Sequence, residues 1–317
     1  MATYKQIFGK QVKFLSADPP AALGEGQVWY NSTSNTFKSV VGSTAWSSAP
    51  ALNVDRGIAG LSTGAGVQTA GIAAGGYNGP SFGNTDSTEE YNGSAWTAGT
   101  GMGTARRAGA GFGVQTALLI GGGHGASAST TATETYNGSS WTAGGVMVSN
   151  YHNLVGAGTT TAGLSFGSSE SPTQTSSYDG SSWTAATALP VAKVNGGGCG
   201  TQGAALAVGG FPVNTQSYEW GGSSWTAGGD LPAGAPANTN AFGIQTAAIL
   251  GGTPSPTVTQ SYDGTTWTNV GVAMGNPRSV YGAGGSQTSG MAFGGSPYVS
   301  STEEYTDAPA VKTITTS

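Results

Sequence analysis

The phrase "SSYDGSSWTA" at Ser176–Ala185 has near-copies along most of the chain, and this repetition constrains the fold more than any other feature. The copies are "EEYNGSAWTA" (Glu89–Ala98), "ETYNGSSWTA" (Glu134–Ala143), "EWGGSSWTA" (Glu219–Ala227) and "SYDGTTWTN" (Ser261–Asn269). Their tryptophans are 45, 42, 42 and 42 residues apart. A fixed period of this size is typical of repeated structural units, each of which is too small to bury a core alone.

Two further landmarks precede each Tyr…Trp phrase. A Gly/Ala-rich run that closes on Gln-Thr, such as "GAGFGVQT", is followed by an apolar run that ends in glycine, such as "ALLIGG". The third unit departs from the pattern, with "GAGTTTAG" where Gln-Thr is expected. The Asn-Gly and Asp-Gly pairs supply residues with positive φ for tight hairpin turns. Each unit therefore reads as four short antiparallel strands.

This pattern predicts an all-β protein with a six-bladed β-propeller of four-stranded antiparallel blades. Glycine accounts for 56 of the 317 residues, and only 8% of the chain is charged. Small side chains suit the innermost strands, which crowd around the axis of a propeller. The repeated tyrosines and tryptophans suit the outer strands, where we expect them to pack between neighbouring blades rather than to bind a ligand.

The first and last parts of the chain are expected to close the ring together. The sixth unit runs through Tyr305 without a tryptophan, and "VGSTAWSS" (Val41–Ser48) matches the missing strand, with Trp46 in the tryptophan position. Residues 42–50 would thus complete the last blade, and closure would leave no open edge. Either Thr36–Val41 or Ser301–Tyr305 could supply the third strand of that blade.

The predicted organisation has three parts. Residues 1–41 form an N-terminal arm and a β-hairpin, "GQVWYNSTSNTFKSVV", which together act as an anchor. Residues 42–307 form the propeller, and residues 308–317 form a C-terminal tail that leaves the repeat pattern.

The repeat, with its strand ending in Gly-Gly followed by Tyr and then Trp, resembles the kelch repeat from Ala51 to Tyr305. The segment "ADPPAALGEGQVWYNSTSNTFKSVVGSTAW" is similar to segments of structural and tail-associated proteins of tailed bacteriophages, particularly marine cyanophages. The first resemblance implies a kelch-like propeller, which can host enzymes or binding modules alike. The second implies a virion protein, which is synthesised in the host cytoplasm.

The residues argue against most catalytic chemistry, and we expect no enzyme activity, no cofactor and no metal site. A copper site of the galactose oxidase type needs histidine ligands and a Tyr–Cys crosslink, but the chain has two histidines in different units, and its one cysteine, Cys199, is expected to be buried. The "YDGSSW" phrase misses the Asp-box of sialidases by one residue. Glu89–Glu90 and Glu303–Glu304 are adjacent pairs that point opposite ways along a strand, so we expect them to be solvated rather than catalytic.

A net charge of −5 and the scarcity of basic residues also argue against nucleic-acid binding, and no apolar stretch is long enough for membrane insertion. Arg56, Arg106 and Arg278 follow the tryptophan strands at equivalent positions, which favours a structural role in the repeat for these arginines.

Recognition is expected on the propeller face that carries the loops between strands 2 and 3 of a blade and between strand 4 and the next blade. The candidate ligand-binding residues on this face are Tyr77, Phe82, Arg106, His124, Tyr151, His152, Phe211, Arg278 and Tyr298.

The sequence therefore predicts a non-enzymatic virion structural protein of a tailed phage, such as a tail-fibre or other host-attachment component. Its arm would bind other virion proteins, and its loop face would bind a host-surface glycan or a virion protein, with homo-oligomers possible. The alternative is a purely structural decoration protein of capsid or tail, and a carbohydrate-active enzyme is the least favoured reading.

Overall fold

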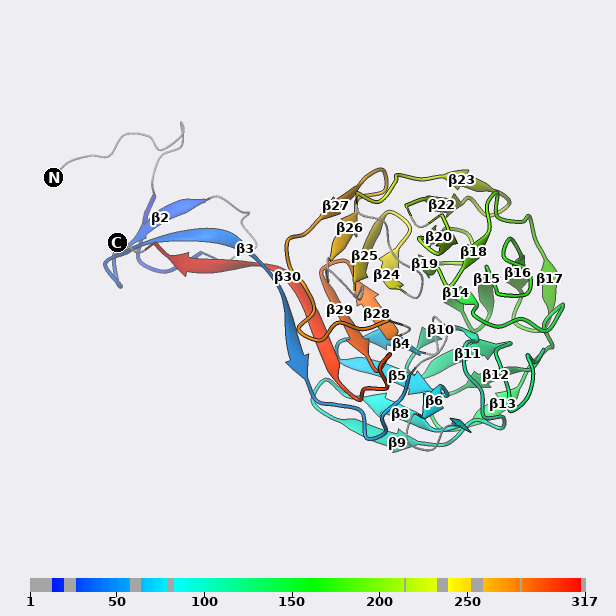
Figure 1. The fold of residues 1–317 in the computed structure, drawn as a ribbon. Coiled ribbons are helices and arrows are strands. Elements are labelled where there is room, and N and C mark those ends of the chain that lie inside the picture. The colour runs from blue at the N-terminus through cyan, green and yellow to red at the C-terminus, as the bar shows by residue number, and fades with distance from the viewer. Residues whose placement is uncertain are drawn as a thin grey trace. The chain divides into compact units, whose positions relative to one another are not determined.

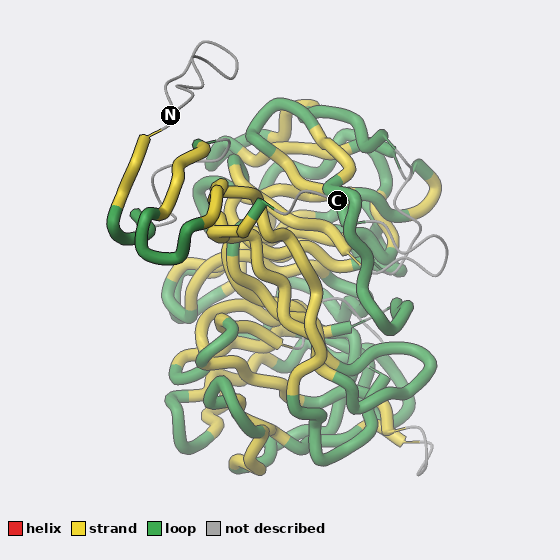
Figure 2. The backbone as a smooth tube through the Cα atoms, turned by 90° about the vertical axis from the view of Figure 1, so that its left-hand side faces the viewer, coloured by secondary structure: helices red, strands yellow, loops and turns green. Residues whose placement is uncertain are grey.

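The computed structural model describes residues 13–19, 27–57, 64–78, 83–213, 215–232, 239–251, 259–279 and 281–314. Within these ranges the regular structure consists of strands without helices (Figure 2), which confirms the predicted all-β class. The chain divides into two compact units. Unit 1 comprises residues 1–45 and 306–317, and unit 2 comprises residues 46–305.

Five sheets of unit 2 each consist of four antiparallel strands in the order in which they occur along the chain. Sheet 1 contains β4 (Gly64–Val67), β5 (Ala70–Ala74), β8 (Thr88–Tyr91) and β9 (Trp96–Gly99). Sheet 2 contains β10 (Ala110–Val114), β11 (Ala117–Gly121), β12 (Thr133–Tyr136) and β13 (Trp141–Ala143). Sheet 3 contains β14 (Val155–Thr159), β15 (Ala162–Phe166), β16 (Thr175–Tyr178) and β17 (Trp183–Ala185). Sheet 4 contains β19 (Gly197–Gly200), β20 (Ala205–Val208), β22 (Ser217–Trp220) and β23 (Trp225–Ala227). Sheet 5 contains β24 (Asn240–Ile244), β25 (Ala247–Gly251), β26 (Gln260–Tyr262) and β27 (Trp267–Asn269).

The sixth sheet combines strands from both ends of the chain. It has six strands, in the order β28 (Gly282–Ser286), β29 (Ser289–Phe293), β30 (Thr302–Thr313), β3 (Thr36–Ala49), β2 (Val28–Asn31) and β1 (Lys13–Leu15), and β3 carries Trp46. The predicted pairing of the Trp46 strand with the last sequence repeat is confirmed. The open question about the third strand is also answered, because β30 occupies that position and residues 36–41 belong to β3.

The turn between the third and fourth strands shows why the Asn-Gly and Asp-Gly pairs recur. Gly180 has a φ of 97°, and the Asp179 Oδ1 atom accepts hydrogen bonds from the backbone N–H groups of Ser181 and Ser182, both 2.8 Å long. The side chain thus closes a four-residue loop between Tyr178 and Trp183. Asn92, Asn137 and Asp263 close their loops in the same way.

The core of unit 2 lies between sheets. Its buried apolar residues form six clusters, and each cluster draws on two neighbouring sheets. One cluster joins sheet 6, through Met291 and Phe293, to sheet 1, through Tyr91 and Trp96. The prediction that the repeated tryptophans pack between neighbouring repeats is therefore confirmed.

The first strands of the sheets lie innermost in unit 2, and the sheets follow one another in chain order around a common centre (Figure 1). Each first strand contacts the first strand of the next sheet, from β4 through β10, β14, β19 and β24 to β28. Strand β28 in turn contacts β4. The last sheet is thus the neighbour of the first.

A hydrogen bond from a tryptophan accompanies each of these junctions. The indole Nε1–H of Trp183 donates to the hydroxyl of Thr133, at the start of the third strand of the preceding sheet, over 2.9 Å. The same bond joins Trp141 to Thr88, Trp225 to Thr175 and Trp267 to Ser217. At the junctions of sheet 6, Trp46 donates to Thr259 over 2.8 Å, and Trp96 donates to Thr302 over 3.0 Å. The strand from the N-terminal part therefore enters the same network as every other fourth strand.

The glutamine of the Gln-Thr turn also connects neighbouring sheets. The Gln115 side chain donates to the backbone carbonyls of Gly71 and Tyr91 in the preceding sheet, at 3.0 and 2.8 Å. Equivalent bonds start from Gln68, Gln202, Gln245 and Gln287. The third sequence repeat has threonines where this glutamine is expected. The junction between sheets 2 and 3 therefore has no glutamine amide as a donor.

Unit 1 contains β1 (Lys13–Leu15), β2 (Val28–Asn31) and the parts of β3 and β30 that lie within residues 1–45 and 306–317. Strands β2 and β3 form the predicted hairpin, with Tyr30 opposite Phe37, and β1 pairs with β2 in parallel. The carboxylate of Asp18 accepts hydrogen bonds from the Trp29 indole and the Asn31 amide, at 3.1 and 2.6 Å.

Strand β30 continues to Thr313, so residues 308–313, predicted as part of a tail, belong to a strand of unit 1. No repeat landmark marks these residues in the sequence. Residues 1–12 of the predicted arm lie outside the described residues.

The bond between Trp96 and Thr302 offers a test of the junction between sheets 6 and 1. We expect Trp96→Phe and Thr302→Val each to lower the free energy of unfolding by about 1–3 kcal/mol, because each leaves a buried polar group without its partner. The double variant should lose less than the two single losses combined, by about 1 kcal/mol. Urea unfolding of the four proteins measures this difference, and strictly additive losses would contradict a bond between the two side chains.

Candidate functional site

Three arginines that follow the tryptophan strands are buried in ion pairs. Arg278 is 1% exposed, and its Nη2 atom lies 2.6 Å from Glu303 Oε1. Arg106 is 0% exposed and lies 3.0 Å from Glu134, and Arg56 forms the same pair with Glu89. The structural role predicted for these arginines is confirmed. The inclusion of Arg106 and Arg278 among the ligand-binding residues was wrong, because neither guanidinium reaches the surface.

The glutamates of these pairs also correct an expectation. Glu89 and Glu303 are 1% and 2% exposed, so they are not solvated charges. Their neighbours do point the opposite way, as predicted: Glu90 accepts a hydrogen bond from the Tyr136 hydroxyl at 2.6 Å, and Glu304 accepts one from Tyr91 at 2.9 Å. One glutamate of each pair thus braces its own sheet, and the other contacts the next sheet.

The two kinds of predicted recognition loop lie side by side. Gly57, in the link that precedes β4, forms a backbone bridge with Tyr77, in the segment after β5. Arg107 bridges to His124 in the same way at sheet 2, and Ser279 bridges to Ser296 at sheet 6. This pairing brings side chains from four sheets onto one surface, which we call the Tyr–Arg–His surface: Tyr77, Arg107, His124, His152 and Tyr298.

At one end of this surface, two tyrosines and an arginine are in contact. The rings of Tyr77 and Tyr298 have centroids 5.7 Å apart, and the Arg107 guanidinium lies 4.9 Å above the Tyr77 ring. Tyr298 is 45% exposed and has a φ of 32°, a conformation that costs free energy in a residue other than glycine. Its ring lies against Gly57, where an added Cβ would come within 2.6 Å of it. Glycine at position 57 therefore makes room for this tyrosine.

Asn84 ties Arg107 to the neighbouring loop. Its Oδ1 atom accepts a hydrogen bond from Arg107 Nη1 at 2.8 Å, and its Nδ2 atom donates to the backbone carbonyls of His124 and Gly125. The guanidinium is thus held both by a tyrosine face and by an amide, which fixes the plane of its fork.

At the other end, two histidines meet a carboxylate. The rings of His124 and His152 are edge to face, with centroids 5.5 Å apart. Glu170 Oε1 lies 2.5 Å from His152 Nδ1 and accepts a hydrogen bond from Ser129 Oγ at 2.5 Å, while Glu170 Oε2 accepts one from the His152 backbone N–H. Burial alone would raise the pKa of Glu170, but these hydrogen bonds outweigh it and lower the pKa below its usual value.

Ser129, His152 and Glu170 have the composition of a hydrolase triad without its geometry. In a triad, the hydroxyl and the carboxylate contact opposite nitrogens of the imidazole. Here Ser129 Oγ and Glu170 Oε1 both lie at Nδ1 of His152, at 2.9 and 2.5 Å. The serine hydroxyl also donates to the carboxylate itself, so the histidine is not placed to take its proton.

Among the described residues, Tyr151 and Phe211 do not join this surface. Tyr151 packs partly buried against the cluster between sheets 2 and 3. Phe211 is 66% exposed on the short strand β21 (Phe211–Pro212), which pairs with β18 (Lys193–Val194). Phe82 lies outside the described residues.

Sequence reasoning missed Asn84, Arg107, Ser129 and Glu170. Arg107 had a usable signal, because Arg106–Arg107 is the one pair of adjacent basic residues, and neighbours in an extended segment face opposite ways. One arginine of the pair is buried, so the other faces outward.

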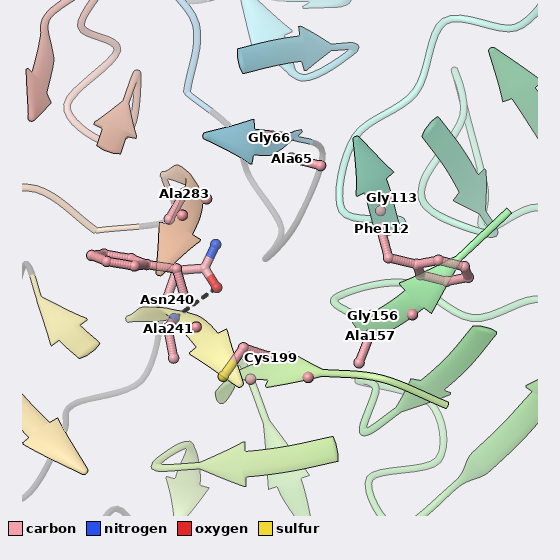
Figure 3. Close-up of a pocket in the computed structure, with 18 residues that line it drawn as sticks. Ala65, Gly66, Phe112, Gly113, Gly156, Ala157, Cys199, Asn240, Ala241 and Ala283 are labelled. Atoms are coloured by element: carbon pink, nitrogen blue, oxygen red, sulfur yellow. Dashed lines mark hydrogen bonds between the residues drawn. The ribbon is translucent and has the colours of Figure 1, made fainter. Parts of the chain in front are cut away.

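A pocket of about 140 Å³ lies among the first strands of all six sheets (Figure 3). Its lining is mostly glycine and alanine, with Phe112, Cys199, Asn240 and Phe242, and contains no charged side chain. The Asn240 side chain is used within the protein, accepting from the Ala241 N–H and donating to the Tyr281 carbonyl. Burial raises the pKa of the Cys199 thiol to about 12, so this thiol stays protonated, and Cys199 is buried as predicted. The pocket thus offers no group for acid–base or nucleophilic chemistry.

In the part of the chain that the structure describes, no three histidine, cysteine or acidic side chains are grouped so that they could hold a metal ion. The described residues likewise include no helix that could cross a membrane. No protein-family model matches the chain, and no curated protein matches it either.

The buried ion pairs predict a contrast between two arginines. Arg278→Met should lower the free energy of unfolding by about 3–5 kcal/mol, because Glu303 stays buried without its cation. Replacing both partners by Met should recover much of this loss. Arg107→Gln, at the surface, serves as the control and should cost about 1 kcal/mol or less. Urea unfolding measures all three, and an equal cost for the two single variants would refute the structural role of Arg278.

Proposed function

We propose that unit 2 is a six-bladed, kelch-like β-propeller that acts as a non-enzymatic recognition module of a tailed-phage particle. The propeller is supported by six repeated sheets, by contacts between successive first strands and by the contact of β28 with β4. The kelch-like reading depends on the repeated Gly-Gly, Tyr and Trp landmarks.

The observation that carries the recognition role is the Tyr–Arg–His surface. Side chains from sheets 6, 1, 2 and 3 meet there, on segments that connect strands rather than on the strands of the core. Connecting segments on a rigid scaffold are where binding residues concentrate. The strained backbone of Tyr298 points in the same direction, because such strain persists where the surroundings enforce it and is common at ligand sites.

Two observations support the non-enzymatic assignment. Ser129, His152 and Glu170 lack the geometry of a hydrolase triad, and the pocket among the first strands of the six sheets has no charged side chain. The polar side chains of the surface are arranged to hold one another and the loops, and they suit recognition better than proton transfer.

Attachment to the particle is assigned to unit 1. The rings of Phe14, Tyr30 and Phe37 form a row with centroid separations of 5.3 and 5.2 Å, and Phe14 is 73% exposed. Exposed aromatic groups of this kind favour burial against another protein. The virion assignment itself comes from the resemblance of the N-terminal segment to phage structural proteins.

Imaging tests the location. Antibodies raised against the full chain should label intact particles of the phage whose genome encodes it, in a fixed position on each particle. Absence of the chain from purified particles would overturn the virion assignment.

Two variants separate attachment from recognition. Phe14→Ser should lower the copy number of the chain on particles several-fold, because it removes an exposed aromatic contact without disturbing a core residue. Tyr298→Ala should leave the copy number unchanged and slow adsorption of the particles to host cells. Quantitative immunoblots of purified particles and adsorption rates measure the two effects. Normal incorporation of the Phe14 variant would place attachment elsewhere on the chain.

A further inference from the structure

The distribution of positive charge in unit 2 is uneven in a way that points to a ligand. Residues 46–305 contain five lysine and arginine residues against twelve aspartate and glutamate residues, a formal net charge of 5 − 12 = −7. Four of the five cations, Arg56, Arg106, Lys193 and Arg278, are buried at 2% exposure or less. Arg107 is the remaining one, and it lies on the Tyr–Arg–His surface.

Within the part of the chain that the structure describes, Arg107 keeps most of its hydrogen-bonding capacity available. Asn84 takes one guanidinium N–H, and among the described residues the ion pairs of the chain do not include Arg107. A guanidinium has five N–H donors in a planar fork that matches the two oxygens of a carboxylate. The Tyr77 ring and Asn84 hold this fork in one plane, so little conformational freedom would be lost when a carboxylate binds.

The carboxylate of Glu170, which contacts the surface at His152, is already engaged. Glu170 accepts hydrogen bonds from Ser129, from the His152 backbone and at His152 Nδ1, and its partners lie at the histidine end of the surface. Glu170 is therefore turned toward His152 rather than toward Arg107.

The groups beside Arg107 suit a sugar ring. The Tyr77 ring carries the guanidinium over its face and contacts the ring of Tyr298, which is nearly half exposed. Aromatic side chains offer large apolar faces together with a hydroxyl, which matches a pyranose with its apolar C–H face and polar rim. The tyrosines and histidines follow one another across four sheets, an extended arrangement that fits a chain of sugars better than a single small molecule.

We propose that the Tyr–Arg–His surface binds a carboxylate-bearing glycan, with Arg107 paired to the carboxylate of a uronic acid and with Tyr298 against a sugar ring. This inference rests on the recognition role proposed above and names the ligand class. The net charge of unit 2 opposes non-specific binding of any polyanion, so binding has to arise from local contacts within a Debye length of about 8 Å at physiological salt.

The test uses the full chain and two matched probes, an oligogalacturonate and its methyl ester, in which the carboxylate is neutral and the sugar is unchanged. Titration calorimetry at 0.15 M salt should show binding of the acid form, with the ester about tenfold weaker or more, the effect of one charge-assisted hydrogen bond. Dextran sulfate serves as a general polyanion and should bind no better than the ester.

Variants then locate the contact. Arg107→Gln should weaken binding of the acid form about tenfold or more and leave binding of the ester unchanged. Arg107→Lys should recover part of the loss, because it keeps the charge without the planar fork. Tyr298→Ala should weaken both probes. Lys38→Gln, the same change of charge in unit 1, should have no effect, and thermal melts establish that each variant is folded.

Equal binding of acid and ester, an Arg107→Gln variant that binds like the original, or no binding of either probe would overturn the acidic-glycan proposal. Preference for dextran sulfate would also overturn it, in favour of general anion binding. None of these results affects labelling of the particle or the adsorption defect of Tyr298→Ala, so failure here is distinguishable from failure of the virion function.

Discussion

The hydrogen bond from each tryptophan indole to a hydroxyl of the preceding sheet is the constraint on which the rest of unit 2 depends. The acceptor hydroxyl lies at the first position of the third strand or next to it. It belongs to Thr88, Thr133, Thr175, Ser217, Thr259 or Thr302. An indole buried without an acceptor would cost about 1–3 kcal/mol, so each bond fixes both the rotamer of the tryptophan and the position of its sheet. Because the junctions are specified in this way, the connecting segments are free to differ, and the Tyr–Arg–His surface is built from those differences.

The second position of the same strand shows how local departures stay compatible with the repeat. Sheets 1, 2 and 6 place Glu89, Glu134 and Glu303 there, each paired with a buried arginine. In sheet 4 the position holds Tyr218, and the buried cation is Lys193, which lies 5.5 Å above the tyrosine ring and donates to two backbone carbonyls. Burial lowers the pKa of Lys193 to about 8. A change of the acidic partner thus accompanies a change of the cation, which is expected where a buried charge has to be matched.

A similar departure opens a pocket between sheets 3 and 4. In sheets 1, 2 and 5 a tyrosine of the third strand donates to a glutamate of the preceding sheet, as Tyr262 does to Glu219. Sheet 4 has Trp220 in the tyrosine position, sheet 3 has Ser177 in the glutamate position, and both residues line a pocket of about 260 Å³. The shorter serine leaves space that the glutamate would have filled.

Much of this architecture was predictable from the sequence, because tryptophans at a fixed spacing and Asn-Gly turns depend on local chemistry and on one repeat length. The position of Trp46 in the last sheet followed from the same reasoning. The burial of the glutamates was not predictable, because a charged residue that recurs along the chain usually faces water. The arginine that pairs with each glutamate also lies two dozen residues or more earlier in the chain, in the segment that precedes the sheet. The sequence pattern also did not predict that an apolar residue six or seven positions after each tryptophan is buried. These six buried residues are Leu52, Met102, Met147, Leu189, Leu231 and Met274. At the candidate site, the sequence identified the right loops but not the contacts across them, which depend on how Gly57 and Asn84 bring the loops together.

The central proposal is that the six sheets close into one cooperative ring through the Trp46 strand. Native-state hydrogen exchange on the full chain tests it most directly, because it measures the opening free energy of each sheet separately. A closed ring predicts that the slowest amides of β5 and β29, at the junction of the first and last sheets, exchange with the same free energy as those of β15 and β20. If β5 and β29 exchange through an opening several kcal/mol below the global value, the ring is open at that junction and the account is wrong.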